Sequence, residues 1–547
     1  MTKWIVCSAW PYLDGRPHLG TFIHLISADV YARYLRLLRR DTVSVSGSDE
    51  HGTPMEVEAL KAGLPPERLA EKYHQEMLGL LKSYMIELDN YTKTESAVHV
   101  DFVREFYKGV EENGYVHSSM EEQLYCEQDS RFLPDRFVEG TCPHCKADAA
   151  RGDQCDACGR LLEPLELVNP RCVVCGRRPV PRKSRHWFFD LPKLSDGLDA
   201  YIHGNANLPA NARNMSLSWL KEGLQARALT RDNKWGIQAP FDGAEGKKIY
   251  VWMEAVLGYV SAVKELGERR GEALVESFWK DKDTRSVFFI GKDNILFHTI
   301  IFPALLMASR EGYTLPWQVS STEFILFDGK KFSKSKRIGV WMDEALKVAP
   351  AEYWRFAMMY LRPELRDANF TWPDFDRIAN GELNDVLGNF IHRVLTFVKR
   401  FFDLSVPPCG GLDAETSSML AEIESRWGEY VRNMDSFRIR DALKSMVELS
   451  RKGNEFISTK QPWNLVKTEK DAAATVVHVG VQAVYTLAVM MYPFMPAAAG
   501  NLRAMLGLEG DPVGAGASGA GSGAALPAGH KILPPSPLFN KVAVPGA

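Results

Sequence analysis

The sequence lacks a charge excess of either sign. Its 66 lysines and arginines face 69 aspartates and glutamates, a formal net charge of −3. This excludes a polycation of the histone kind, so any surface that binds nucleic acid must be a local patch. Hydrophobic residues make up 45% and charged residues 25%, which excludes disorder over the whole length. At about 150 residues per domain, the chain is long enough for three or four domains.

Long apolar runs are also missing. The run at 3–8 is short, is followed by Pro11, and leads to no small-residue cleavage site, which is unlike a secretory signal. The longest apolar stretch, 476–495, is interrupted by His478, Gln482 and two tyrosines. It fits a buried bundle helix better than a membrane span. We therefore expect a cytoplasmic protein with no membrane partner.

Cysteines are few but clustered. Seven of the nine fall between Cys126 and Cys175, and in a reducing compartment such clustering indicates metal rather than disulfides. The turns Cys142/Cys145 and Cys155/Cys158 are close in sequence, and two CxxC turns complete a tetrahedral zinc site. Cys7 and Cys409 lie outside the cluster, and we expect them to be buried small apolar side chains.

The first hundred residues have the pattern of an α/β fold. Residues 3–8 predict a strand, residues 19–38 an amphipathic helix, and the alternation around Val43 and Val45 a second strand. This order is typical of a doubly wound parallel sheet of the Rossmann type. Ligands bind such sheets at the carboxyl ends of the strands, so loops 9–18 and 47–54 are candidate site loops.

The rest of the chain divides by composition. Residues 115–190 are rich in Cys, Gly, Pro and Arg, as in a small metal-stapled insertion. The α/β pattern returns with a strand at 286–290, a helix at 294–309 interrupted at Pro303, and a strand-like run at 320–327 before a turn at 328–329. Residues 380–507 read as a helical bundle, and 513–525 as a flexible Gly/Ala/Ser loop. The apolar tail residues Leu538, Phe539 and Val542 could dock back on the body.

Two short segments carry groups suited to phosphate. The segment 17–21 (PHLGT) stands where a strand leads into a helix, whose free N–H groups and positive dipole end favour an anion. The segment 330–335 (KKFSKS) interleaves lysines with serines and could clamp a polyphosphate. Taken singly, the first could be a plain turn and the second a solvated charge run.

Together, these segments resemble the HIGH and KMSKS motifs of class I aminoacyl-tRNA synthetases. Four further segments, AWPY at 9–12, GSDEHGTP at 47–54, FIGKD at 289–293 and FH at 297–298, resemble those of methionyl-tRNA synthetases. The resemblance extends through the Cys-rich insertion and the helical third, and so covers nearly the whole chain.

The resemblance implies an α/β fold of the Rossmann type, a doubly wound parallel sheet with a zinc-knuckle insertion, followed by an α-helical anticodon-binding bundle. The implied domains are the first half of the catalytic domain at 1–115 and the connective insertion at 116–230. The second half of the catalytic domain follows at 231–325, the KMSKS loop and stem-contact region at 326–379, and the anticodon-binding domain with its tail at 380–547.

The resemblance also implies a reaction. L-Methionine is activated with ATP to methionyl-adenylate plus pyrophosphate, and the methionyl group passes to the 3′-terminal adenosine of tRNA(Met), with Mg²⁺ accompanying ATP. The implied catalytic residues are His18, Arg231, Lys331 and Lys334. The implied ATP-binding residues are His18, Gly20, Thr21, Lys331, Ser333, Lys334 and Ser335. The two lysines would sit on a mobile loop able to close over ATP.

The methionine pocket is implied in the same way, by Trp10, Tyr12, Asp49, Trp252, Ala255, Tyr259 and His298. Asp49 would bind the ammonium, although it could instead be only a loop cap. Arg231 would organise either Asp49 or the substrate carboxylate. His298 would help to supply a donor for the thioether, a weak acceptor, although a lone histidine in an apolar helix is usually a satisfied core residue.

An outer metal site is implied by Cys126, Cys172 and Cys175, with Asp129 where relatives carry a fourth cysteine. A carboxylate can ligate zinc, so this site is either filled through Asp129 or an empty, degenerate knuckle. Anticodon contacts are implied for Asn389, Arg393 and Trp463, in which the tryptophan stacks a base. The alternative is a core tryptophan beside a solvated polar face.

Some features depart from the family pattern. Thr21 replaces the second histidine of HIGH, and His24, one turn further on, cannot occupy the same point. The role of Asn294 is open. The chain lacks the C-terminal dimerisation domain of some relatives, so we expect a monomer.

Two alternatives remain. A synthetase for Leu, Ile or Val would carry a far larger insertion than the about 115 residues found here, and one for Cys is also possible. A catalytically inactive tRNA-binding scaffold has only Thr21 in its favour.

Overall fold

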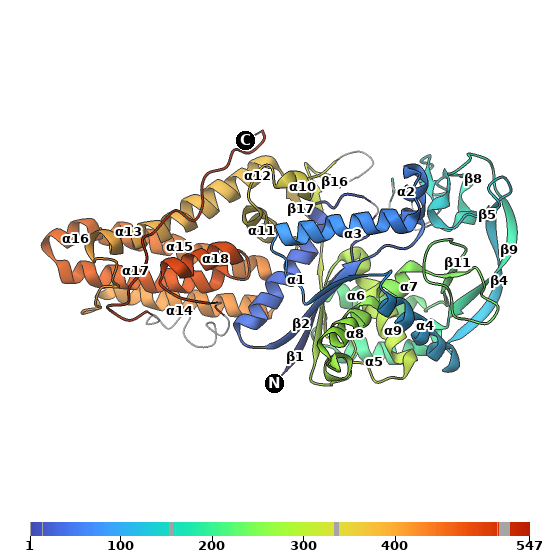
Figure 1. Cartoon of the computed structure of the whole chain (residues 1–547), viewed down its shortest axis with the longest axis horizontal. Coiled ribbons are helices and arrows are strands. Elements are labelled where there is room, and N and C mark those ends of the chain that lie inside the picture. The colour runs from blue at the N-terminus through green and yellow to red at the C-terminus, as the bar shows by residue number, and fades with distance from the viewer. Residues whose placement is uncertain are drawn as a thin grey trace.

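The structure, a computed structural model, describes residues 2–13, 15–152, 155, 157–158, 160, 162–332, 338–510, 512 and 526–546. Ser333, Lys334, Ser335 and the loop 513–525 of the sequence analysis lie outside these described residues. The chain forms an α/β half that contains the central sheet and an elongated helical half beside it (Figure 1).

The central sheet has five parallel strands in the order β14–β13–β1–β2–β3. Their bounds are β1 Lys3–Ser8, β2 Asp41–Ser48, β3 Asn90–Lys93, β13 Arg285–Gly291 and β14 Gln318–Thr322. The chain adds strands outward on one side of β1 and later on the other, so the order reverses between β1 and β13. This confirms the doubly wound parallel sheet and puts the ligand crevice at the carboxyl ends of β1, β2 and β13.

Alternate residues of the strands pack into two separate hydrophobic cores, one on each face of the sheet. Trp4 and Val6 join the core that contains α1 (Leu19–Leu37) and α11 (Ala351–Tyr360), whereas Ile5 and Cys7 join the core on the other face. That second face is covered by α4 (Ala97–Glu112), α8 (Gly258–Arg270) and α9 (Phe302–Ser309). Burial on both faces explains why β1 and β13 read as continuous apolar runs rather than as alternating ones.

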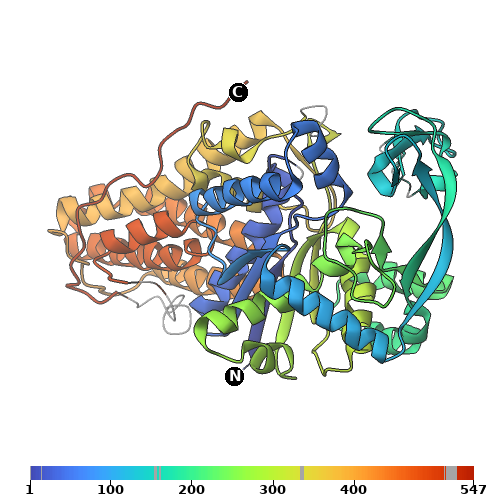
Figure 2. The same cartoon turned by 45° about the vertical axis from the view of Figure 1, so that its right-hand side comes forward.

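The Cys-rich insertion is a long antiparallel ribbon with a small globular tip. Strands β4 (Val116–Cys126) and β9 (Val180–Phe189) pair along their length. The tip contains β5 (Arg131–Phe132), β6 (Val138–Thr141), β7 (Ala150–Arg151) and β8 (Val168–Cys172). The ribbon curves so that the tip lies beside α2 (Thr53–Ala62), as both views show (Figures 1 and 2). The side chain of Val57 in α2 packs against the core of the tip.

Further elements connect these parts. The helices are α3 Pro66–Ser83, α5 Ser195–Gly204, α6 Ala210–Glu222, α7 Val251–Ala255, α10 Met342–Ala345 and α12 Trp372–Asp376. The strands are β10 Arg227–Ala228, β11 Thr230–Arg231, β12 Lys248–Ile249, β15 Ile325–Phe327, β16 Lys330–Lys331 and β17 Ala368–Phe370.

The helical half confirms the bundle predicted from residue 380 onward. It contains a π-helical segment Arg377–Gly388, α13 Asn389–Phe401, α14 Ala414–Asp435, α15 Ile439–Lys460, α16 Pro462–Thr468, α17 Lys470–Met491 and α18 Pro496–Met505. Helix α17 is long and apolar enough to cross a membrane by length and composition alone, but 94% of its most apolar window is buried inside the fold. This burial is what the sequence analysis expected of a bundle helix.

A buried arginine joins the two halves. Arg355 of α11 donates to Oδ2 of Asp29 in α1 across 2.6 Å, and to the carbonyls of Pro493 and Phe494 beyond α17. Both charged side chains are fully buried. The chain tail strengthens this junction, because Phe539 is buried and packs against Tyr353 of α11, as expected of a docked tail.

Several local predictions need correction. Residues 292–309 are helical without a break, and the irregularity expected at Pro303 is a π-turn at Phe297–Ile301, directly before the turn that contains this proline, which has no N–H for the helical ladder. The run 320–327 splits into β14 and β15, which belong to different sheets. Cys409 is exposed in the connection after α13, so the prediction that it is buried was wrong, whereas Cys7 is buried. Trp463 lies in the first turn of α16, not in a loop.

Candidate functional site

The loops after β1 and β2 are joined at the carboxyl edge of the sheet. The backbone N–H of Leu13 donates to the carbonyl of Asp49 across 3.1 Å, and the N–H of Asp49 donates to the carbonyl of Pro11 across 3.0 Å. A backbone bridge thereby brings Tyr12 beside Asp49. The sheet topology thus unites two residues that the sequence analysis assigned to one pocket.

The ring of Trp10 is buried between two glycines. A Cβ atom would lie 2.6 Å from the Trp10 ring at Gly47 and 2.5 Å from it at Gly258. No real Cβ comes so close to another atom, so both positions need glycine for the indole to fit. Gly258 was missed by the sequence analysis, because a glycine soon after a helix usually indicates only where that helix ends.

Asp49 is a buried carboxylate in need of a cation. Its side chain is 4% exposed, and its Oδ1 atom accepts no hydrogen bond from the described residues. Burial, and then the charge of Glu254, raise the pKa of Asp49 well above its usual value. Since an unpaired buried charge is costly, the site favours a cationic group from a ligand.

A charged cluster beneath Asp49 was not foreseen. His51 contacts Glu254 through Nδ1 at 2.7 Å and Glu95 through Nε2 at 2.5 Å. Burial alone would lower the pKa of His51, but Glu254 and Glu95 raise it to about 10, so the imidazole is cationic at neutral pH. Glu254 lies in α7, far from the loop 47–54 in sequence, and only its position two residues after Trp252 could have drawn attention to it.

Aromatic side chains, Tyr12 and Tyr259 among them, lie close to Asp49. His298 is buried, and burial lowers its pKa to about 4, so the ring is neutral at pH 7. Its Nδ1–H donates to the carbonyl of Asn294 across 2.9 Å, and Nε2 accepts from the hydroxyl of Tyr259 at 2.9 Å. The backbone of Asn294 therefore orients His298, which gives this residue a role that the sequence analysis had left open.

Trp252 and Ala255 of α7 are half-buried at the same end of the sheet. The Trp252 ring lies 6.3 Å from that of Tyr12 and 4.7 Å from that of Phe297, a residue that the sequence analysis quoted but did not assign to the pocket. The aromatic rings offer an apolar wall with a hydroxyl and an imidazole at one side.

The segment 17–21 at the start of α1 is held in place by the chain that follows the lysine-rich segment 330–335. The N–H of Leu19 donates to the carbonyl of Val340, and the N–H of Met342 donates to the carbonyl of Pro17. The ring of His18 stacks on that of Phe332 with centroids 5.0 Å apart. The fold thus joins the two motif segments, although Ser333, Lys334 and Ser335 themselves lie outside the described residues.

The other residues of these segments take different positions. Gly20 and Thr21 lie in the first turn of α1, and Lys331 is exposed with its Nζ atom 4.8 Å from the Phe324 ring. His24 turns to Thr322 of β14, with Nε2 and Oγ1 2.8 Å apart.

The side chain of Arg231 contacts the insertion. Its Nε atom is 3.6 Å from a carboxylate oxygen of Asp135, and its guanidinium lies over the Tyr250 ring at 4.1 Å. These contacts lie away from Asp49, which is one of the two groups that Arg231 was expected to organise, the other being the substrate carboxylate.

Two four-residue clusters in the insertion have the chemistry of metal sites. Cys142, Cys145, Cys155 and Cys158 form one, and Cys126, Asp129, Cys172 and Cys175 form the other, with the ligand atoms of each cluster within 4.8 Å of one another. The sulfur–sulfur distances are 3.9 Å for Cys142–Cys158, 3.6 Å for Cys145–Cys155 and 3.4 Å for Cys126–Cys175, close to the edge of about 3.8 Å expected for a zinc–thiolate tetrahedron. Asp129 Oδ2 lies 3.1 Å from Cys126 Sγ and 3.0 Å from Cys172 Sγ, as a fourth ligand would.

The bundle unites two of the three residues expected at an anticodon. The Arg393 guanidinium lies 5.9 Å from the Trp463 ring and donates to Asn454 Oδ1 across 3.2 Å. Trp463 is half-buried, with its ring 6.2 Å from that of Phe397. Asn389 is exposed, one helical turn before Arg393.

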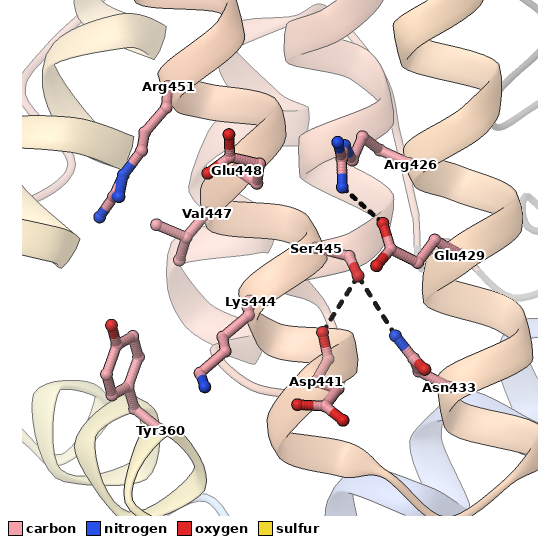
Figure 3. A pocket seen from close by; sticks show the side chains of 10 residues that line it. All are labelled: Tyr360, Arg426, Glu429, Asn433, Asp441, Lys444, Ser445, Val447, Glu448 and Arg451. Atoms are coloured by element: carbon pink, nitrogen blue, oxygen red, sulfur yellow. Dashed lines mark hydrogen bonds and ion pairs between the residues drawn. The ribbon is translucent and has the colours of Figure 1, made fainter.

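A separate polar cavity of about 360 Å³ lies between α11, α14 and α15 (Figure 3). Arg426 and Glu429 form an ion pair on its wall, and the hydroxyl of Ser445 donates to the carbonyl of Asp441. Its charged lining is Arg426, Lys444, Arg451, Glu429, Asp441 and Glu448. The equal numbers of opposite charges favour no ion of either sign, and none of the expected site residues lines it.

Comparisons with known proteins agree along the whole chain. A family model described as "tRNA synthetases class I (M)" matches residues 4–395, and one described as "Anticodon binding domain of methionyl tRNA ligase" matches residues 406–544. The chain is 54% identical over 511 residues to a methionine–tRNA ligase from Korarchaeum cryptofilum, covering 93% of this chain and 91% of that protein. It is 52% identical over 542 residues to that of Thermofilum pendens, covering 99% and 95%.

A solved structure supports the fold. Mycobacterium tuberculosis methionyl-tRNA synthetase in complex with methionyl-adenylate superposes with a TM-score of 0.82 at 24% identity, covering 98% of this chain and all of that one.

Proposed function

The chain belongs to the methionyl-tRNA synthetase family of class I tRNA synthetases, and from this premise we propose how its residues serve the methionine–tRNA ligase reaction. The enzyme activates methionine with ATP and transfers the methionyl group to tRNA. The observation that carries the residue assignment is the buried, incompletely paired carboxylate of Asp49 beside an aromatic slot.

Methionine binds with its ammonium at Asp49 and its side chain in the slot. An ammonium group would supply the missing partner of Asp49 and offset the cost of its burial. Trp10, Tyr12, Trp252 and Ala255 enclose the methylene groups. Tyr259 and His298 contact the thioether, a weak acceptor to which the Tyr259 hydroxyl can donate.

ATP binds at the start of α1, with its phosphates toward His18, Gly20 and Thr21. A carboxylate oxygen of methionine attacks the α-phosphorus in line, the bond to the β-phosphate oxygen breaks, and pyrophosphate leaves. Lys331, Ser333, Lys334 and Ser335 close over the phosphates and neutralise the developing charge. Mg²⁺ bound with ATP would supply further positive charge for the phosphates. In the second step a ribose hydroxyl of the terminal adenosine attacks the methionyl carbonyl and AMP leaves. Arg231 organises the side of the pocket next to the insertion.

The two clusters of the insertion hold zinc. Cys142, Cys145, Cys155 and Cys158 would form the inner site, and Cys126, Asp129, Cys172 and Cys175 the outer one. Zinc in a closed four-ligand site supplies structure rather than chemistry, because no coordination position is left for substrate.

The remaining assignments concern tRNA and organisation. Trp463 stacks an anticodon base, which Asn389 and Arg393 contact from α13. The domains run 1–115, 116–230, 231–325, 326–379 and 380–547. The enzyme acts as a monomer in the cytoplasm.

The test is ATP–pyrophosphate exchange with each of the twenty amino acids in the absence of tRNA. We expect exchange with methionine alone. Exchange with a different amino acid would overturn the pocket assignment. Absence of exchange from a folded, zinc-loaded enzyme, with and without tRNA, would favour an inactive scaffold.

A further inference from the structure

One buried carboxylate joins three segments that are far apart in the sequence. Glu56 of α2 is 4% exposed. Its Oε1 atom accepts hydrogen bonds from the backbone N–H groups of Lys234 and Trp235 across 2.9 and 3.0 Å. Its Oε2 atom accepts from Nη2 of Arg131 across 2.9 Å. Both oxygens are therefore used, one toward the insertion and one toward the chain after β11.

On the insertion side, Arg131 is held by the tip that contains the metal-type clusters. Arg131 stands opposite Cys126 in the β4–β5 pairing and follows Asp129 by two residues. Its guanidinium carbon lies 3.6 Å from the centre of the Phe137 ring, which is fully buried in the core of the tip. The position of this guanidinium therefore depends on the fold of the outer cluster.

On the other side, Trp235 holds the loop that carries Asp49. The indole Nε1–H donates to the carbonyl of Glu50 across 2.7 Å. The same ring meets the His51 ring edge-on at 5.3 Å. Glu50 and His51 directly follow Asp49, so the backbone position of Trp235 sets where the loop places the Asp49 carboxylate.

We propose that Glu56 is a positioning residue for methionine binding, through which the outer cluster of the insertion holds the Asp49 loop in place. This inference rests on the proposed binding of methionine at Asp49. A buried ion pair contributes little net stability compared with apolar packing, so a geometric role accounts better for its presence.

The decisive variant is Glu56→Gln. The amide oxygen can still accept from Lys234 and Trp235, but the amide NH₂ faces the Arg131 guanidinium, which cannot accept a hydrogen bond. Only the link to the insertion is lost. We expect the KM for methionine to rise about 10- to 100-fold, the size of effect that a displacement of about 1 Å produces, while the KM for ATP stays within about two-fold.

A matched control lies on the same helix. Glu58 of α2 is 39% exposed and pairs only loosely with Lys61, at 3.6 Å. Glu58→Gln removes the same charge two residues away, and we expect it to leave both KM values and the amide exchange of residues 47–55 unchanged.

Variants of Arg131 and of the outer cluster give two further experiments. Arg131→Met should reproduce the rise in methionine KM, and the double variant with Glu56→Gln should be no worse than the stronger single variant. Removal of metal from the outer site by Asp129→Ala should speed amide hydrogen exchange of residues 47–55 in the wild-type background and add nothing in the Glu56→Gln background.

The outcomes separate this inference from the proposed function. The inference would be overturned, even if methionine is the substrate, by one result in both Glu56→Gln and Arg131→Met. In that result the KM for methionine and the rate of amide hydrogen exchange of residues 47–55 stay within about two-fold of wild type. A wild-type enzyme without methionine exchange would overturn the proposed function, while faster exchange of the loop amides in Glu56→Gln would still show the coupling. A lower melting temperature with unchanged methionine KM would show a purely structural role and also overturn the inference.

Discussion

The hydroxyl of Tyr259 donates its proton to Nε2 of His298 across 2.9 Å, because Nδ1 of the same imidazole is already committed to the carbonyl of Asn294. Both side chains are fully enclosed beside Asp49. The hydroxyl proton of Tyr259 can turn from the imidazole to a ligand, and among the side chains that we propose to bind methionine it is suited to recognising a sulfur atom.

Tyr259→Phe should weaken the preference for methionine over norleucine, in which a methylene replaces sulfur. The ring is retained and only the donor is lost, so we expect the ratio of kcat/KM values for the two amino acids to fall about tenfold, the effect of one buried hydrogen bond. Pyrophosphate exchange with each amino acid measures it. An unchanged ratio would mean that the hydroxyl does not contact the sulfur.

Gly258→Ala should displace the Trp10 ring, because the new Cβ would lie 2.5 Å from it. We expect the KM for methionine to rise about tenfold or more, since relief of this overlap moves a wall of the pocket. Gly79→Ala in α3 is the matched control, because no neighbouring atom lies within 4 Å of its Cβ position. Equal kinetics for the two variants would contradict the placement of Trp10 in the pocket.

The raised pKa of Asp49 predicts opposite effects on activity and stability. The unfolded chain loses this proton at a lower pH than the folded chain does, so ionisation of Asp49 lowers the free energy of unfolding as pH rises through the folded pKa. Asp49→Asn should therefore raise the melting temperature at pH 7 and abolish methionine exchange.

In the wild-type enzyme, kcat/KM for methionine should fall as pH drops through this raised pKa, above the usual range of an aspartate. Binding of ATP alone, measured by equilibrium dialysis, should show no such dependence. An Asp49→Asn variant with normal methionine affinity would show that Asp49 does not bind the ammonium.

The two metal-type clusters should be separable by single substitutions. We expect about two zinc ions per chain, and about one in either Cys142→Ser or Asp129→Ala, since each removes one ligand of a four-ligand site. Asp129→Cys restores a four-thiolate set and should retain both ions. Elemental analysis of the purified protein checks this, and an Asp129→Ala variant with wild-type metal content would show that the outer cluster holds none.

Trp463→Ala should impair tRNA charging without affecting methionine activation. Stacking on an aromatic side chain contributes about 1–3 kcal/mol per base, so we expect the KM for tRNA to rise about 5- to 100-fold. Trp463→Phe keeps an aromatic surface and should lose less. Pyrophosphate exchange without tRNA is the control, and a fall in that rate would indicate damage to the fold instead.

The sequence alone predicted the elements whose signals are local. The strand–helix–strand start that is typical of a doubly wound parallel sheet, the CxxC turns and the helical third each depend on residues close together in the chain. Motif order then identified the candidate residues, and the structure brings Tyr12 beside Asp49 and Tyr259 beside His298.

Tertiary structure decided everything that depends on contacts between distant segments. Cys409 is exposed because its surface connection offers no core to enter, and Arg231 faces Asp135 because the ribbon folds back over α2. The sandwich of Trp10 between Gly47 and Gly258 and the use of both Glu56 oxygens have no local signature. A side chain's partners are set by packing across the sheet and the insertion, and packing is a property of the folded chain rather than of any window of its sequence.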